Sequence, residues 1–259
     1  NNGSGGAFQT GSTLTSLTDH HALQLMVDGT LTINSGMISS AFFTVGNTSS
    51  ASTLILGGNL DFGTREAIIN NQNGYYNMTA GVISGGEMFI RSNISGSGGL
   101  TKTGFQQGRL EGQNSYSGLT TINDGVILVT SGRTGLGVGG AGNGIVIQGN
   151  GGLNTGFGIQ VGTAAAPEDL LIKALQGDQQ ILRNDNDLTN WFGDVIIDNV
   201  DAAGQVLFTP RIRTDANATT IINGDIYGGP TAVTNDIIAI DSRVVQFDAA
   251  GNNTFIFRG

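Results

Sequence analysis

Acidic side chains gather in one part of the sequence, where two arginines follow them. Clustered carboxylates beside a cation can act as acid and base in the cleavage of glycosidic bonds, and carboxylate oxygens also bind calcium. A glycan-cleaving site is therefore the first chemistry to weigh. The set consists of Asp185, Asp187, Asp194, Asp198 and Asp201, with Arg211 and Arg213 downstream.

The surrounding residues do not complete such a site. Arg-Ile-Arg at 211–213 is similar to a basic tripeptide of polygalacturonases, but the Asp-Asp pair and the Gly-His-Gly segment of that family are missing. A repeat described below offers a structural explanation for Asp185 and Asp187, as a corner equivalent to Ser115 and Ser117. Because a fold does not confer an activity, we expect no catalytic residues and no enzyme.

Metal and phosphate sites are also incomplete. His20 and His21 are adjacent, so a strand would point them to opposite faces, and the chain has no other His and no Cys. Asn-Asp-Asn-Asp at 184–187 lacks the Gly and distal Glu of an EF-hand, and the Gly-rich stretch 135–144 lacks the Lys-Ser/Thr of a phosphate loop. We expect no cofactor; a calcium-stabilised adhesin is a further alternative.

Two aromatic pairs could offer flat surfaces to sugar rings: Tyr75 with Tyr76, and Trp191 with Phe192. Successive side chains of a strand point to opposite faces. One member of each pair should therefore point inward, and we expect ordinary packing.

The composition favours strands and turns. The 259 residues include 43 Gly and 3 Pro, only 12% are charged, and the net charge is −9. An acidic chain does not suit nucleic acid or anionic lipid, and no stretch approaches the roughly 20 apolar residues of a membrane helix. The lack of Cys is compatible with export. With no initiator Met and no visible signal peptide, we expect a processed product or a piece of a longer protein.

Short strand-and-turn patterns recur along the chain. The stretch 28–40 resembles 73–85, which lies 45 residues later, and 52–63 falls between them with Leu54 on Leu31 and Leu60 on Met37, each 23 residues on. The stretch 31–38 also resembles 120–127, and 219–226 is a rearranged copy. These spacings indicate a unit of 22–23 residues.

Such a unit predicts an all-β fold, a parallel β-helix of about 11–12 coils, in which strands of successive coils stack about 4.8 Å apart. A narrow core of this kind suits Thr, Val and Ile, with Gly at corners. We expect one domain over 1–259, with regular coils in 1–162, an irregular insertion or short helix in 163–182, and further coils in 183–259. A β-sandwich and a β-propeller are the alternatives.

Residues 98–129 resemble the autotransporter-associated β-strand repeat. The first block matches at Gly99, Leu100, Thr101, Lys102 and Gly104, and the second at Asn114, Tyr116, Gly118, Thr120, Ile122, Gly125 and Leu128. A weaker second copy places Trp191 at the position of Tyr116 and Gly193 at that of Gly118. The resemblance implies a right-handed β-helix in an extracellular or surface-displayed bacterial protein, and no catalytic activity.

The expected function is therefore structural: a rod, stalk, adhesin or end-to-end stacked filament subunit at the bacterial surface. Self-association through unpaired strand edges is the expected partnership, with surface glycans as a further partner, no nucleic acid and no membrane insertion. The alternative function is a carbohydrate-binding or carbohydrate-cleaving β-helix.

Overall fold

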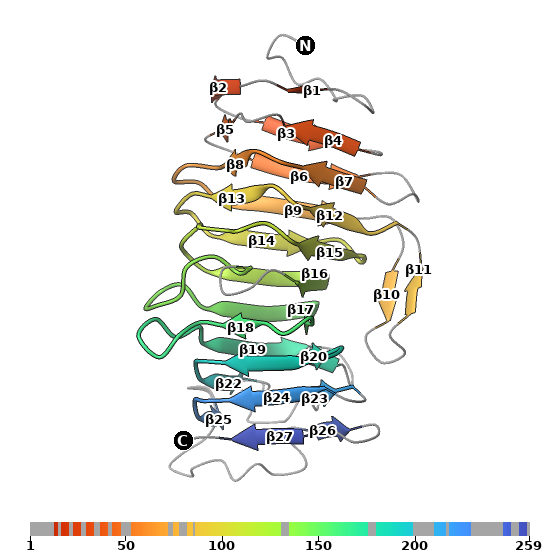
Figure 1. Ribbon diagram of the computed structural model, residues 1–259, viewed down its shortest axis with the longest axis vertical. Coiled ribbons are helices and arrows are strands. Elements are labelled where there is room, and N and C mark those ends of the chain that lie inside the picture. Colours follow the sequence, from red (N-terminus) through yellow and green to blue (C-terminus); the bar gives the residue numbers. More distant parts are fainter. Residues whose placement is uncertain are drawn as a thin grey trace.

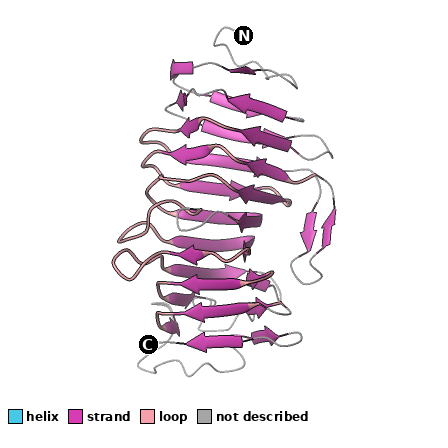
Figure 2. Ribbon diagram, in the orientation of Figure 1, coloured by secondary structure: helices cyan, strands magenta, loops and turns pink. Residues whose placement is uncertain are grey.

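The computed structural model describes most of the central chain and separate strands toward both ends. The described residues are 13–14, 17–20, 23–26, 30–33, 37–40, 43–47, 53–71, 75–77, 82–84, 86–130, 135–175, 180–198, 210–215, 218–228, 246–249 and 254–257. Side chains are described within 54–71, 86–130, 135–173, 181–198, 210–215 and 218–226. All elements in these ranges are strands, and none is a helix (Figure 2).

The strands stack into a ladder along the long axis of the molecule, from β1 at one end to β27 at the other (Figure 1). Most of the described coils contribute a strand to each of three faces in turn. Face 1 consists of β3 (Leu23–Met26), β6 (Phe43–Asn47), β9 (Ala67–Asn71), β14 (Leu100–Thr103), the first parts of β16 (Thr120–Val129) and β17 (Ile145–Thr155), β19 (Leu170–Leu175), β22 (Val195–Asp198) and β25 (Ile226–Gly228).

Face 2 continues the same sheet, because β16 and β17 run through the corner with shifts in register. Its strands are β1 (Thr13–Leu14), β4 (Thr30–Ile33), β7 (Thr53–Leu56), β12 (Met88–Ile90), β15 (Gln107–Leu110), the second parts of β16 and β17, β20 (Gln180–Asn184), β23 (Arg211–Thr214) and β26 (Gln246–Ala249).

Face 3 holds two blocks of four strands. They are β2 (Leu17–His20), β5 (Met37–Ser40), β8 (Asn59–Asp61) and β13 (Asn93–Ser95), then β18 (Gln160–Val161), β21 (Leu188–Trp191), β24 (Thr219–Ile222) and β27 (Thr254–Phe257). Backbone hydrogen bonds from Ser115 to Ile94 and from Val138 to Tyr116 continue this face between the two blocks.

Every pairing on the three faces is parallel, which confirms the predicted β-helix and rules out the sandwich alternative. Among the described residues the ladder passes ten times along face 2, from β1 to β26. The spacing between paired residues is not constant. It ranges from 19 residues, as in Gln107 with Val126, to 35 residues, as in Thr53 with Met88.

The longest early coil contains an insertion. Strands β10 (Tyr75–Asn77) and β11 (Val82–Ser84) pair antiparallel with each other and stand beside the ladder (Figure 1). The expectation that 73–85 repeats 28–40 as part of a coil is therefore wrong. A hairpin can imitate a coil in sequence, because both consist of two short strands and a Gly/Asn turn.

The predicted register is also wrong by one residue in the early coils. Leu31 pairs with Ile55 rather than with Leu54, and Leu60 pairs with Ile38 rather than with Met37. The two steps are 24 and 22 residues, so a uniform step of 23 misses both. A single-residue shift reverses which side chains face inward, so only the backbone pairing settles the register.

The three similar eight-residue stretches occupy three different corners. Residues 31–38 lead from face 2 to face 3, residues 120–127 from face 1 to face 2, and residues 219–226 from face 3 to face 1. Their shared pattern therefore marks a strand, a corner and the next strand, and it does not mark a position in the coil.

The stretch 163–182 is not the expected insertion or helix throughout. Residues 163–169 form a loop, in which Thr163 and Ala166 exchange backbone hydrogen bonds, but β19 continues face 1 between β17 and β22. Leu170 and Ile172 point into the core while Lys173 is exposed. Of the charged residues that suggested an irregular segment, Glu168 and Asp169 lie in the loop and Lys173 lies on the outer surface of β19, while Asp178 lies outside the described residues.

The core consists of columns of inward side chains, one from each coil. On face 1, one column contains Ile69, Ile122, Ile147, Ile172 and Ile197, all less than 4% exposed. At the corner of faces 2 and 3 the column changes from Ile90 and Leu110 to Thr155, Asn184 and Thr214. Inward Thr fits here because its hydroxyl finds neighbours: the Thr189 hydroxyl donates to Thr155 at 2.9 Å.

Candidate functional site

The predicted acidic cluster is not assembled by the fold. Asp185 and Asp187 lie at the corner between faces 2 and 3, Asp194 lies at the corner between faces 3 and 1, and Asp198 ends β22. Asp201 lies outside the described residues. A pair of carboxylates that flank one bond, which glycoside cleavage needs, is therefore not formed by these residues in the described part of the chain.

Asp185 instead belongs to an ion-pair network on the outer surface of face 2. The Arg183 guanidinium contacts the Asp185 carboxylate at 2.9 Å and also bonds Asp215 of the next coil. Arg213 contacts Asp215 at 2.6 Å. Burial raises the pKa of Asp185, and the charge of Arg183 opposes that shift. Arg211 and Arg213 flank the buried Ile212, so the Arg-Ile-Arg tripeptide is an alternating strand.

The repeat positions assigned to two aromatic residues are confirmed. Thr120 and Val195 lie in the same column of face 1, and Tyr116 and Trp191 each lie four residues earlier. Both rings are buried, at 1% and 0% exposed. Counting back from Thr120 and Val195 in the same way places Ser115 opposite Asn190 and Ser117 opposite Phe192. Asp185 and Asp187 are therefore not equivalent to Ser115 and Ser117.

The histidine pair and the tyrosine pair singled out in the sequence lie partly outside the residues that the structure describes. His20 ends β2 and its side chain is not described, while His21 lies outside the described residues. Tyr75 and Tyr76 lie on β10, again without described side chains. Within the described ranges, no three His, Asp or Glu side chains gather as a metal-ion site, and no helix is long and apolar enough to span a membrane.

A surface groove opens where three successive coils turn from face 3 to face 1. It encloses about 420 Å³ and is lined by the loop 163–169, by Phe192, Gly193 and Asp194 of the next coil, and by Asn223 and Gly224 of the coil after that. Its lining includes two acidic residues, the exposed Asp169 and the half-buried Asp194, and one aromatic residue, the half-buried Phe192.

The aspartates of this groove form a ladder. The Asp194 backbone N–H donates to Oδ1 of Asp169, and the Asp225 backbone N–H donates to Oδ1 of Asp194, both at 2.9 Å. Each carboxylate is thus held in place through one oxygen by the coil that follows. Sequence reasoning missed this set, although each aspartate directly precedes an apolar strand of face 1.

A buried lysine hydrogen-bonds the backbone at a corner inside the β-helix. Lys102 is 0% exposed, and its Nζ donates to the backbone carbonyls of Thr103 at 2.8 Å, Gly104 at 2.7 Å and Asp124 at 3.2 Å. It occupies the isoleucine column of face 1. Gly108 borders its stem, and a Cβ there would lie 3.5 Å from Lys102 Cε, an ordinary contact distance. Burial lowers the pKa of Lys102 to about 7, and the charge of Asp124 opposes the shift.

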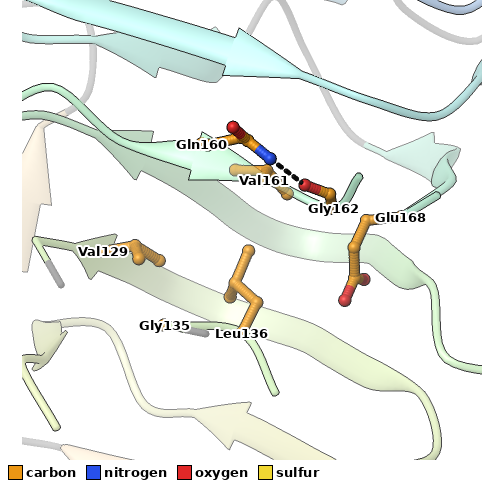
Figure 3. A pocket seen from close by; sticks show the side chains of 7 residues that line it. All are labelled: Val129, Gly135, Leu136, Gln160, Val161, Gly162 and Glu168. Carbon is orange, nitrogen blue, oxygen red and sulfur yellow. Dashed lines mark hydrogen bonds between the residues drawn. The ribbon is translucent and has the colours of Figure 1, made fainter. Parts of the chain in front are cut away.

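A buried acid lies behind the groove. Glu168 is 2% exposed and borders a crevice that has no room for a water molecule, between Leu136 and Val161 (Figure 3). Its Oε2 has no hydrogen-bond partner in the described part of the chain. Burial raises the pKa of Glu168 to about 8, and the charge of Asp169 adds to the shift. With a closed crevice around it, Glu168 has no access to a substrate.

Comparison with known proteins yields no relative. The chain matches no family model, no curated protein and no solved structure.

Proposed function

We propose that this chain is a rod-forming structural segment of an extracellular bacterial surface protein, serving as a stalk, an adhesin or a filament subunit. The observation that supports it most is the uninterrupted parallel ladder. Faces 1 and 2 form one sheet of 17 strands that runs the length of the molecule (Figure 1). In such a solenoid each coil contacts only its neighbours, so length grows by adding coils.

The polar groups of the interior also support a structural role. Asn114 donates from Nδ2 to the Gly135 carbonyl at 2.7 Å and accepts at Oδ1 from the Ile94 N–H at 3.0 Å, which links three coils. Asn71 donates to the Gln107 carbonyl at 2.9 Å. Lys102 satisfies three corner carbonyls. These buried residues hydrogen-bond backbone groups that the sharp corners leave without strand partners.

The resemblance of residues 98–129 to the autotransporter-associated repeat supports the bacterial surface location. The side chains that match it are used in packing: Leu100, Tyr116 and Ile122 lie in the core. Gly118 and Gly125 have φ of 89° and 64°, which suits corners that only glycine adopts without strain. The repeat thus encodes coil geometry, as expected of a stalk.

Electron microscopy of the native protein, with intact mass on the same sample, tests this proposal. The described coils predict straight rods about 45 Å long at the spacing of stacked strands. Continuous fibres of the same width, built from chains of 26.6 kDa, would show that copies stack end to end. Compact particles without an elongated axis would overturn the rod.

A variant distinguishes end-to-end stacking through strand edges from other kinds of self-association. A chain with proline in the last described strand, as in Phe255→Pro, loses a backbone donor of β27 and cannot extend the ladder there. If fibres form through stacked strand edges, this variant should stay as single rods. Fibres that persist in the variant would exclude stacking at that edge and would leave the rod itself unaffected.

A further inference from the structure

We propose that the groove between the loop 163–169 and the two coils below it binds an amine-bearing sugar, namely a hexosamine unit with a free ammonium group. The inference does not depend on the rod proposal, because it concerns the side of the helix and not its ends. The groove, of about 420 Å³, is large enough for a small ligand.

Charge selects a cationic ligand. Asp169 and Asp194 line the groove, and its lining contains no Lys, Arg or His among the residues that the structure describes. The whole chain carries a net charge of −9, so an acidic glycan would be repelled. Since one oxygen of each carboxylate already accepts a backbone N–H, both groups are held in position before the ligand arrives.

Phe192 and Asn223 favour a sugar over a small cation as the ligand. Phe192 is half-buried at the groove, and its ring offers an apolar surface to the C–H face of a pyranose. Asn223 adds an amide, although its Nδ2 is engaged by Asn190 Oδ1 at 2.7 Å, so its amide oxygen is the group left for a hydroxyl. Carboxylate, amide and ring together suit a ligand that is both hydroxylated and charged.

Two glycines in the groove let three successive coils approach closely. A Cβ at Gly224 would lie 2.1 Å from the carbonyl oxygen of Gly193, and one at Gly193 would lie 2.1 Å from the carbonyl oxygen of Glu168. A side chain at either position would collide with the backbone of the preceding coil, so closely stacked backbone forms this part of the groove. The groove covers two coil spacings, about 10 Å, which is long enough for a disaccharide.

The test measures binding of the full chain to three oligosaccharides of equal length by calorimetry: glucosamine, N-acetylglucosamine and glucose oligomers. We expect the glucosamine oligomer to bind at least about tenfold tighter than the other two, and more weakly as salt rises. No binding of the glucosamine oligomer, or equal affinity for all three, would overturn the proposal.

Variants locate the site and exclude general attraction to an acidic protein. Asp169→Asn with Asp194→Asn removes both charges but keeps the oxygens that accept the ladder hydrogen bonds, and it should weaken binding about tenfold or more. Phe192→Ala should also weaken it. Asp187→Asn and Phe157→Ala, which alter an exposed acid and an exposed ring at another corner, are matched controls and should bind within twofold of the parent.

A fold control completes the test. All variants should keep the parent's circular dichroism spectrum and melting temperature within a few degrees, because none of these side chains fills the core. If the Asp187→Asn control loses as much affinity as the double variant, binding follows net charge and the groove is not the site.

Discussion

Lys102 and Glu168 are two ionisable side chains buried in the same helix, but their surroundings differ. Lys102 lies at the corner of faces 1 and 2, where three carbonyls accept from its Nζ. Glu168 lies at the corner of faces 3 and 1, beside an apolar crevice, with one oxygen unpartnered in the described part of the chain. Burial disfavours the charged form of both groups, but three carbonyls accept hydrogen bonds from Lys102, whereas one oxygen of Glu168 has no partner among the described residues.

The two sites should therefore respond to pH in opposite directions. Glu168 has a folded pKa of about 8 against an ordinary value of 4.5, so the unfolded chain releases this proton first as pH rises and stability falls between those values. Lys102 has a folded pKa of about 7 against 10.5, so the unfolded chain holds this proton longer and stability rises over that interval. Together they predict lowest stability near pH 7 to 8.

The largest expected effect is the decrease in stability between pH 4.5 and pH 8. Between pH 4.5 and 8 the free energy of unfolding should decrease by up to about 5 kcal/mol, and Glu168→Gln should abolish most of that decrease. Urea midpoints measured across this pH range provide the check. The exposed Glu66→Gln is the matched control and should leave the slope unchanged. A wild-type profile that is flat from pH 4.5 to 8 would show that Glu168 is ionised in the folded chain.

Removing the lysine should have the next largest effect. Lys102→Met keeps much of the stem volume but leaves three buried carbonyls without this donor, so the free energy of unfolding at pH 7 should fall by about 3 kcal/mol. The rise in stability between pH 7 and 10.5 should disappear as well. The exposed Lys173→Met is the control, with no expected change in either quantity. A Lys102→Met variant as stable as the parent would show that the corner carbonyls find other donors.

The smallest effect is expected at an exposed pair that joins two coils. Arg91 contacts Glu111 at 2.5 Å, and the arginine side chain is 50% exposed. Water screens such a pair, so Arg91→Ala should lower the free energy of unfolding by less than about 1 kcal/mol. A double-mutant cycle with Glu111→Ala measures the coupling. A coupling as large as the Lys102 effect would mean that surface pairs, rather than buried corners, hold the coils together.

The sequence and the structure agree best where the pattern is local. The repeated strand-and-turn pattern predicts a strand in 120–127, and this stretch lies in β16 of the ladder. The equivalence of Tyr116 with Trp191 is confirmed because no residue is inserted between either ring and the strand that follows it. The register of the early coils and the hairpin β10–β11 were beyond prediction, since insertions at corners change the spacing without changing the local pattern.

The candidate groove illustrates the same limit. Asp194 belongs to the acidic set visible in the sequence, but its neighbours in space are Asp169 and Asn223, which come from the coils before and after it. Its neighbours in sequence, Asp187 and Asp198, lie at other positions around the helix. Residues 25 to 31 apart become adjacent only through the pairing of β19 with β22 and of β22 with β25.

By itself, the sequence determined that this chain forms short strands with apolar inner sides, joined by Gly, Asn and Asp corners and stacked as a β-helix. Only the tertiary structure decided which face each strand occupies and how long each corner is. The physical reason is that similar stretches, such as 31–38, 120–127 and 219–226, are compatible with any of the three corners. Their assignment follows from closing the backbone around three faces while every coil hydrogen-bonds to the one before it.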